Sequence, residues 1–126
     1  MLNLALIVGL WATTCIQTQN TRHSGFAIES YDVRDNGSFD FRREWYADPS
    51  CHQRYDVETE SGVVSVGKKI SGIFVSGNTF EADFQTTTGT DLGAVRVEGS
   101  TLKVARGLRG STMRNTMVGL FDYVKE

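Results

Sequence analysis

The chain has 126 residues, enough for one domain (1–126) with a single core and too few for two. Its 13 basic and 15 acidic residues give a net charge of -2 and are spread along the sequence, so it lacks the basic face that nucleic-acid binding requires. Thirteen glycines against a single proline, with many Thr, Val and Phe residues, favour strands joined by tight turns. We therefore expect an all-β domain without a nucleic-acid partner.

An apolar run extends from Leu4 to Ala12, and it is shorter than the roughly 20 residues that a membrane-spanning helix needs. No Lys or Arg precedes this run and no Ala-x-Ala site follows it, so it differs from a signal peptide. Thr13 and Thr14 stand before Cys15, where a lipoprotein signal would carry small apolar residues. We expect a mature exported domain in which Met1 has replaced the signal, with no membrane span.

Alternating polar and apolar residues predict antiparallel strands along most of the chain. The predicted strands are 9–17, 26–34, 38–46, 52–60, 62–70, 79–86, 94–98, 101–106 and 117–125, with a short apolar piece at 72–75 and a possible short helix at 111–120. A hairpin across Ser61-Gly62 is expected to join 52–60 to 62–70. A turn is expected at 76–78 and polar loops at 20–24 and 85–91. Sequential hairpins without a long crossover favour an up-and-down β-barrel of about eight strands over a sandwich.

The Asn36-Gly37 pair between two alternating segments is the strongest turn signal in the chain, because both central residues of a type I′ hairpin need positive φ. A two-residue loop fixes the register, which places Phe26, Ile28, Phe39, Phe41 and Trp45 inside together with Ser30, Asp32 and Arg43. The same register puts Glu29, Tyr31, Asp40, Arg42 and Glu44 outside. Asp32 then becomes a diagonal neighbour of Arg43 within the interior.

Cys15 and Cys51 are the two cysteines of the chain, and an even number in a strand-rich domain predicts a disulfide and an oxidising compartment. The alternative is two unpaired buried thiols in a cytosolic protein. Each cysteine lies at the end of a predicted strand, where a bridge would fix a loop. On the loop-entropy argument such a bridge contributes roughly 3 to 4 kcal/mol.

The sequence offers enzyme chemistry little support. His23 and His52 lack the spacing of metal ligands, and no phosphate-binding loop, nucleophile elbow or zinc-protease motif is present. Carboxylates such as Asp48, Glu58 and Asp83 are expected on outer strand faces, where nothing would raise their pKa values for acid-base work. We predict a protein that is not an enzyme and that needs no metal or cofactor.

One family resemblance rests on two short motifs. Gly9-Leu10-Trp11 followed by Cys15, and Trp45-Tyr46-x-Asp48-x-x-Cys51, resemble the G-x-W…C and Y-x-D-x-x-C pattern of APCDD domains and their exported bacterial relatives. The G-x-W element alone also resembles lipocalins. The resemblance covers roughly residues 9–55 and implies a secreted or membrane-tethered lipocalin-like barrel, a Cys15–Cys51 disulfide and a hydrophobic, lipid-binding interior. The short single domain leaves binding, not signalling, as the transferable role.

Two functions follow as hypotheses. In the first, a secreted or periplasmic barrel binds a small apolar or amphipathic, lipid-like ligand; its cavity is lined by Trp11, Phe41, Trp45, Tyr55, Phe80 and Phe84, and Asp32 and Arg43 orient a polar end. In the second, a filled barrel binds a protein partner at the cell envelope through loops 85–91 and 107–116. Arg106, Arg109 and Arg114 are interpreted either as an anion-binding group or as a solvated surface.

Overall fold

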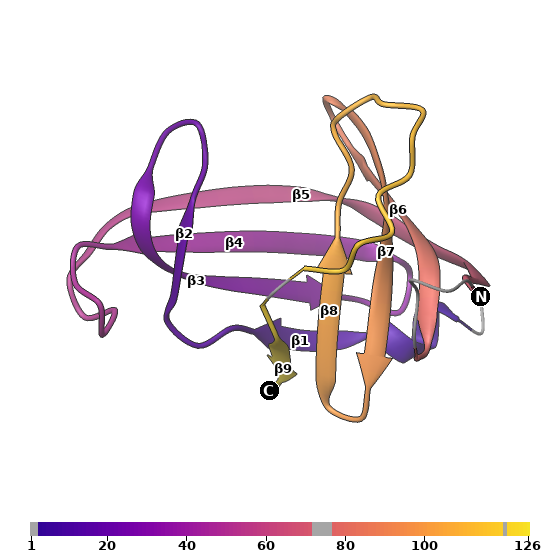
Figure 1. Cartoon of the computed structure of the whole chain (residues 1–126), viewed down its shortest axis with the longest axis horizontal. Helices are drawn as coiled ribbons and strands as arrows, with labels where there is room; N and C mark the ends of the chain where they lie inside the picture. The colour runs from indigo at the N-terminus through magenta and orange to yellow at the C-terminus, as the bar shows by residue number, and fades with distance from the viewer. Residues whose placement is uncertain (1–2, 72–76, 120) are drawn as a thin grey trace.

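A computed structural model describes residues 3–71, 77–119 and 121–126 and has an all-β architecture (Figure 1). A 3-10 helix, η1 (Leu4–Ile7), precedes the strands. The strands are β1 (Gly9–Ala12), β2 (Ile16–Gln19), β3 (Ser24–Val33), β4 (Ser38–Tyr46), β5 (Arg54–Lys69), β6 (Thr79–Thr86), β7 (Gly89–Glu98), β8 (Thr101–Ala105) and β9 (Tyr123–Lys125). Among the described residues, no helix has the length and apolar character needed to cross a membrane.

Eight of these strands form a closed antiparallel barrel. The hydrogen-bonded order β1-β9-β8-β7-β6-β5-β4-β3 returns to β1, because β1 also pairs with β3. The predicted barrel of about eight strands is therefore confirmed. β2 is additional: among the described strands it pairs with β3 alone, so one of its edges is left unpaired.

The predicted first strand, 9–17, is divided into β1 and β2 by a kink at residues 13–15. Both pieces pair with β3, and the pairing shifts by one residue between Ala12↔Ser30 and Ile16↔Ala27. At the kink the Thr13 backbone N–H donates to the Glu29 carbonyl at 2.9 Å, and the Glu29 N–H donates to Thr13 Oγ1 at 3.0 Å. The kink thus satisfies the backbone of Glu29, whose side chain enters the barrel.

Two turn predictions were wrong. Residues 52–60 and 62–70 do not form a hairpin at Ser61-Gly62, because β5 runs straight through both residues. Position 62 requires glycine because of close packing and not because of a turn: a Cβ atom there would lie 2.1 Å from the Gln85 carbonyl oxygen. The loop predicted at 85–91 is likewise reduced to a tight turn, since β6 continues to Thr86 and β7 begins at Gly89.

Further predictions concern the C-terminal segment and residues 72–78. No helix forms over residues 111–119, and β9 is shorter than the strand predicted at 117–125. The apolar piece predicted at 72–75 and residue 76 of the predicted 76–78 turn lie outside the described residues.

The register of the first hairpin differs from the prediction by one residue, and this reverses the two faces of β3, while Phe39, Phe41, Arg43 and Trp45 of β4 keep the predicted inner face. Gly37 has φ +90° and donates to the Arg34 carbonyl at 2.9 Å, while Asn36 does not have positive φ. The loop is therefore a three-residue turn with a glycine bulge in place of the two-residue type I′ turn. Val33 now faces Phe39, and because side chains alternate, Ile28, Ser30 and Asp32 point outward. The observed inner residues of β3 are Ala27, Glu29, Tyr31 and Val33.

One end of the barrel is filled by packed apolar side chains, and we call it the packed half. Its fully buried members are Ile7, Trp11, Val33, Phe39, Val64, Ala82, Phe84, Val95 and Leu102. Phe39 and Phe84 meet edge to face with ring centres 5.6 Å apart. The predicted strand at 79–86 and the predicted hairpin of 94–98 and 101–106 are confirmed here. Val95 and Leu102 are buried, and Phe80, Val97 and Val104 pack against the core.

Candidate ligand cavity

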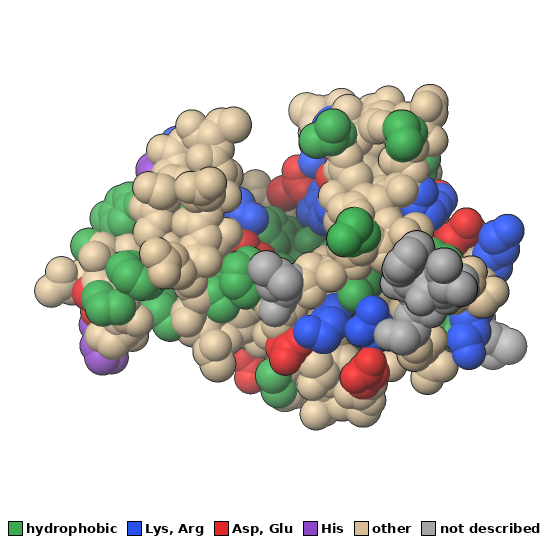
Figure 2. Space-filling view, in the orientation of Figure 1, with side chains coloured by type: hydrophobic (Ala, Val, Ile, Leu, Met, Phe, Trp, Pro, Cys, Tyr) green, Lys and Arg blue, Asp and Glu red, His purple; other side chains and the backbone are tan. Residues whose placement is uncertain are grey.

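The other end of the barrel contains a cavity of about 510 Å³, and we call it the open half. Figure 2 shows the hollow between the lobe formed by the β2–β3 turn and the lobe formed by β6, β7 and the segment after β8. The cavity is lined by Thr18, Asn20, Glu29, Tyr31, Phe41, Arg43, Glu58, Thr59, Glu60, Asp91, Val104, Arg106, Arg109, Phe121 and Tyr123. It is therefore bordered on one side by β2, the strand with a free edge, and on the other by the chain that follows β8.

One part of the cavity holds the Arg43 cluster, which consists of Arg43, Glu29 and Glu58. Arg43 Nε donates to Glu29 Oε2 at 2.7 Å, and Arg43 Nη1 lies 3.6 Å from Glu58 Oε1. The guanidinium also lies over the rings of Phe41 and Trp45, at 5.2 and 5.8 Å from their centres. The charged hydrogen bond to Glu29 and the cation–π contacts with Phe41 and Trp45 together hold the Arg43 guanidinium in place.

The two carboxylates of the Arg43 cluster take further hydrogen bonds from neutral donors. The Tyr123 hydroxyl donates to Glu29, whose side chain is 6% exposed. The Trp45 indole N–H donates to Glu58 Oε1 at 2.7 Å, and the Asn20 amide reaches the same oxygen at 3.0 Å. The cluster therefore contains two acidic groups and a single guanidinium.

The Arg106 cluster consists of Arg106, Arg109, Glu60 and Asp91, and it lies nearer the packed half. Arg106 Nη2 reaches Glu60 at 2.6 Å and Asp91 at 2.7 Å, and Arg109 Nη2 reaches Glu60 at 2.8 Å. Arg106 also covers the Phe84 ring, 4.8 Å from its centre. With two carboxylates and two guanidiniums, the cluster is balanced in charge and forms a polar lid over the packed half.

Hydrogen bonds and nearby guanidiniums favour the ionised form of three cavity carboxylates, Asp91, Glu60 and Glu58. Burial raises the pKa of Asp91, but hydrogen bonds and charge from Arg109 and Arg106 outweigh it, so its pKa lies below the ordinary value. The same balance lowers the pKa of Glu60. For Glu58 burial is again opposed, first by the Trp45 hydrogen bond, and the pKa is lowered. Burial raises the pKa values of Tyr31 and Tyr123, so both hydroxyls stay protonated.

The predicted ligand-binding residues fall into three groups. Phe41 and Arg43 line the cavity, and Trp45 lies directly behind it, since its ring is buried while its N–H reaches Glu58. Trp11, Phe80 and Phe84 belong to the packed half.

Asp32 and Tyr55 form the third group, because both lie outside the barrel. Asp32 is half-exposed and lies 3.7 Å from Arg34 on the outer face, so the predicted contact with Arg43 was wrong. Tyr55 is 50% exposed and packs edge-on against His23. The physical reason is strand alternation: in β5 the even-numbered residues face inward, opposite the odd-numbered residues of β4.

The functional residues that sequence reasoning missed are acidic. Glu58 was expected on an outer face, yet it lines the cavity, as do Glu29, Glu60 and Asp91. The alternation of side chains along β3 could have revealed Glu29, provided that Gly37 was recognised as a bulge residue. In that register Glu29 pairs with Arg43, whereas the predicted two-residue turn pairs Ser30 with Arg43. Arg106 and Arg109 line the cavity, whereas Arg114 lies outside, 2.8 Å from Asp83.

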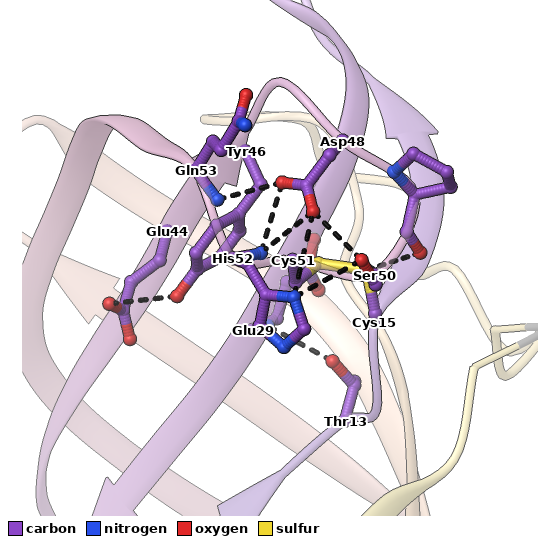
Figure 3. The surroundings of a disulfide bond; sticks show 11 residues. Thr13, Cys15, Glu29, Glu44, Tyr46, Asp48, Ser50, Cys51, His52 and Gln53 are labelled. Atoms are coloured by element: carbon purple, nitrogen blue, oxygen red, sulfur yellow. Dashed lines mark hydrogen bonds and ion pairs between the residues drawn. A yellow bond between two sulfur atoms is a disulfide. The ribbon is translucent and has the colours of Figure 1, made fainter.

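The disulfide joins the kink between β1 and β2 to the turn between β4 and β5 (Figure 3). Cys15, in the kink after β1, is bonded to Cys51, in the turn between β4 and β5, with Cα atoms 5.8 Å apart. Asp48 organises that turn by accepting the backbone N–H groups of His52 and Gln53, at 3.0 and 2.7 Å. These backbone hydrogen bonds lower the Asp48 pKa. The predicted bridge is confirmed, and the Asp48-x-x-Cys51 motif is explained as a turn.

Comparison with known proteins gives one structural likeness. No family model and no curated protein matches the sequence. Among solved structures, the lipoprotein YedD from Klebsiella pneumoniae is similar, with a TM-score of 0.49 and 17% sequence identity over 95% of this chain and 71% of that chain. The closed antiparallel barrel is the architecture that the lipocalin-like resemblance implied. The narrower APCDD assignment stays a prediction.

Proposed function

We propose that this chain is an exported binding protein that holds a small amphipathic, lipid-like molecule in the open half of its barrel. The observation that carries the proposal is the cavity of about 510 Å³ with aromatic walls and two ion-pair clusters. Pockets for small molecules combine apolar walls with placed polar groups, and this cavity has a suitable size. Its aromatic side chains lie beside a larger number of polar and charged ones, which favours an amphipathic ligand over a purely apolar one. The apolar part of the ligand would lie along Phe41, Val104 and Phe121.

Two further parts of the proposal concern location and chemistry. The Cys15–Cys51 bridge supports an exported protein, since structural disulfides are stable in oxidising compartments. We also propose that the barrel binds without catalysing a reaction. The lowered pKa values of Glu58, Glu60 and Asp91 support this, because carboxylates held ionised by arginine are poor proton donors near neutral pH.

Native mass spectrometry of protein purified from its natural source tests the proposal directly, and a retained small molecule is the expected result. For a titration, the Trp11→Phe variant keeps Trp45 as the sole tryptophan, and its bond to Glu58 makes its emission sensitive to the cavity. Adding a twelve-carbon amphiphile to delipidated protein should change this emission in a saturable way. Absence of both a bound molecule and any saturable change would overturn the proposal.

The adjacent arginines of β4 provide a matched pair of variants. Arg43 faces the cavity, whereas Arg42 points outward, is 47% exposed and pairs with Glu44 at 3.5 Å. Arg43→Gln should change ligand affinity about tenfold, because it removes a cavity cation that contacts Glu29 and Glu58. Arg42→Gln should leave affinity within about twofold. Equal effects of the two changes would contradict binding in the cavity.

A second candidate function is an interaction module at the cell envelope. The segment after β8 exposes Leu108, Met113 and Met117, which are 81%, 78% and 84% exposed. Exposed apolar side chains of this size favour a contact with a partner. A partner captured from envelope extracts, and lost after polar substitution of these three residues but not after Arg43→Gln, would support this second function over the first.

A further inference from the structure

We infer that the polar end of the ligand carries a positive charge, and this inference rests on the proposed binding function. The cavity lining contains the carboxylates of Glu29, Glu58, Glu60 and Asp91 and the guanidiniums of Arg43, Arg106 and Arg109. One negative charge is therefore left over. A charged ligand enters such a site most favourably when it neutralises the excess charge.

The excess negative charge is confined to the Arg43 cluster. The Arg106 cluster pairs two carboxylates with two guanidiniums at short distances, so it is neutral as a unit. In the Arg43 cluster, Glu29 and Glu58 share a single guanidinium, which is 2.7 Å from the first and 3.6 Å from the second. The other donors to these carboxylates are neutral groups of Tyr123, Trp45 and Asn20.

The rim of the cavity does not cancel this excess. Arg22 lies 3.6 Å from Glu58, but its side chain is 67% exposed and it also lies 3.9 Å from Asp56. Asp56 also contacts His23 Nε2 at 2.6 Å, and with histidine counted as neutral this rim group of Arg22, His23 and Asp56 contributes no net charge. The exposed Arg22 head group is also screened by water and salt, so a ligand cation that reaches Glu58 can replace it.

Aromatic rings next to the excess charge favour a cation further. Tyr31 contacts Phe41 at a centroid distance of 4.8 Å and meets Tyr123 edge-on at 5.3 Å, and all three residues line the cavity. The negative face of an aromatic ring attracts ammonium groups, and the guanidinium of Arg43 already uses the Phe41 ring in this way. The ligand class is thus an amphipathic ammonium, with its head near Glu58 and its chain toward Phe121.

Three amphiphiles with closely similar chains and a cationic, an anionic and an uncharged head group test the inference: dodecyltrimethylammonium, dodecanoate and dodecyl maltoside. Each is titrated below its critical micelle concentration into the delipidated Trp11→Phe variant. The cation should bind about tenfold more tightly than dodecanoate at low salt, and the preference should shrink at high salt. Equal or tighter binding of dodecanoate would overturn the inference while leaving the proposed function intact. Failure of all three probes to bind would overturn both.

Two carboxylate variants test whether the preference for a cation arises from Glu58. Glu58→Gln removes the excess charge but keeps an acceptor for Trp45, and it should weaken cation binding about tenfold with dodecyl maltoside unchanged. Glu44→Gln is the control, because Glu44 pairs with Arg54 at 2.8 Å on the outer face of β4. Equal loss in both variants would overturn the inference. Should Glu58→Gln fail to fold, Thr18→Lys places a compensating cation at the cavity wall and should weaken cation binding similarly.

Discussion

The packed half and the open half of the barrel are built from the same strands but differ in what fills them. In β5, Val64 is 1% exposed within the core, whereas Glu58 and Glu60 on the same face line the cavity. β4 carries Phe39 at its packed end and Arg43 four residues later in the open half. Position along a strand therefore decides between core and binding site, while alternation decides only between inside and outside.

The largest expected effect tests whether stability depends on the packed half. Phe39→Ala should lower the free energy of unfolding by about 4 kcal/mol, because Phe39 is fully buried and its removal leaves a cavity against Phe84. Phe41→Ala, at the cavity wall, should cost less than half as much, since its ring already borders open space. Chemical denaturation of both variants measures the difference, and equal losses would abolish the distinction between the halves.

The disulfide should matter most to the open half, where packed apolar residues are few. Replacing both Cys15 and Cys51 with Ser should cost about 3 to 4 kcal/mol, because the bridge closes a loop with a sequence separation of 36. Hydrogen exchange should show that the amides of β2 lose protection before those of β6 and β7. A uniform loss of protection along the chain would contradict a local role for the bridge.

The Arg106 cluster joins the two halves, so breaking it should destabilise the fold as well. Asp91→Ala removes a partner from both Arg106 and Arg109, and the loss should be about 3 kcal/mol, since a buried charge is left undercompensated. Asp83→Ala is the control: its carboxylate pairs with Arg114 on the outside, and the loss should stay below about 1 kcal/mol. Thermal and chemical unfolding measure both values, and a smaller effect of Asp91→Ala would show that the cluster is replaceable.

Acidification should lower the stability of the open half. The folded-state pKa values of Glu58, Glu60 and Asp91 lie below their ordinary values near 4, so each carboxylate contributes stability that is complete above that pH. This contribution should be lost as pH falls through 4 toward the folded-state values, so the free energy of unfolding should decrease on acidification. Unfolding measured between pH 7 and pH 3 checks the slope. Stability that rises toward pH 3 would contradict the pKa directions.

Much of the barrel followed from local patterns, and most of the cavity did not. β4 and β6 have the bounds that alternation predicted, and the cysteines pair as expected. Inside and outside were reversed in β3 because one turn residue changes the parity of the strand. The position of Glu58 depends on its pairing across β4, and that of Arg106 on closure of the barrel. Such contacts join residues distant in sequence, which no local periodicity encodes.

The smallest expected effect concerns the turn that sets that parity. Gly37 has φ +90°, and a Cβ there would lie 3.0 Å from the Val64 carbonyl oxygen, so Gly37→Ala should cost about 1 to 2 kcal/mol. Asn36→Ala removes the acceptor of two hydrogen bonds, which the Ser38 N–H and the Ser38 hydroxyl donate to Asn36 Oδ1 at 2.9 and 2.8 Å, and it should cost about 0.5 to 1 kcal/mol because the site is exposed.

The comparison with Asn36→Gly separates the two turn types. In a type I′ turn, glycine at position 36 would relieve positive φ and stabilise the hairpin. In the bulged turn it relieves no strain, removes the same hydrogen bonds from Ser38 and adds chain entropy to the unfolded state. We therefore expect Asn36→Gly to be destabilising, with Glu29 and Arg43 still paired inside. A stabilised Asn36→Gly variant would indicate the two-residue turn. That turn implies the register in which Asp32 points into the barrel and Glu29 points outward.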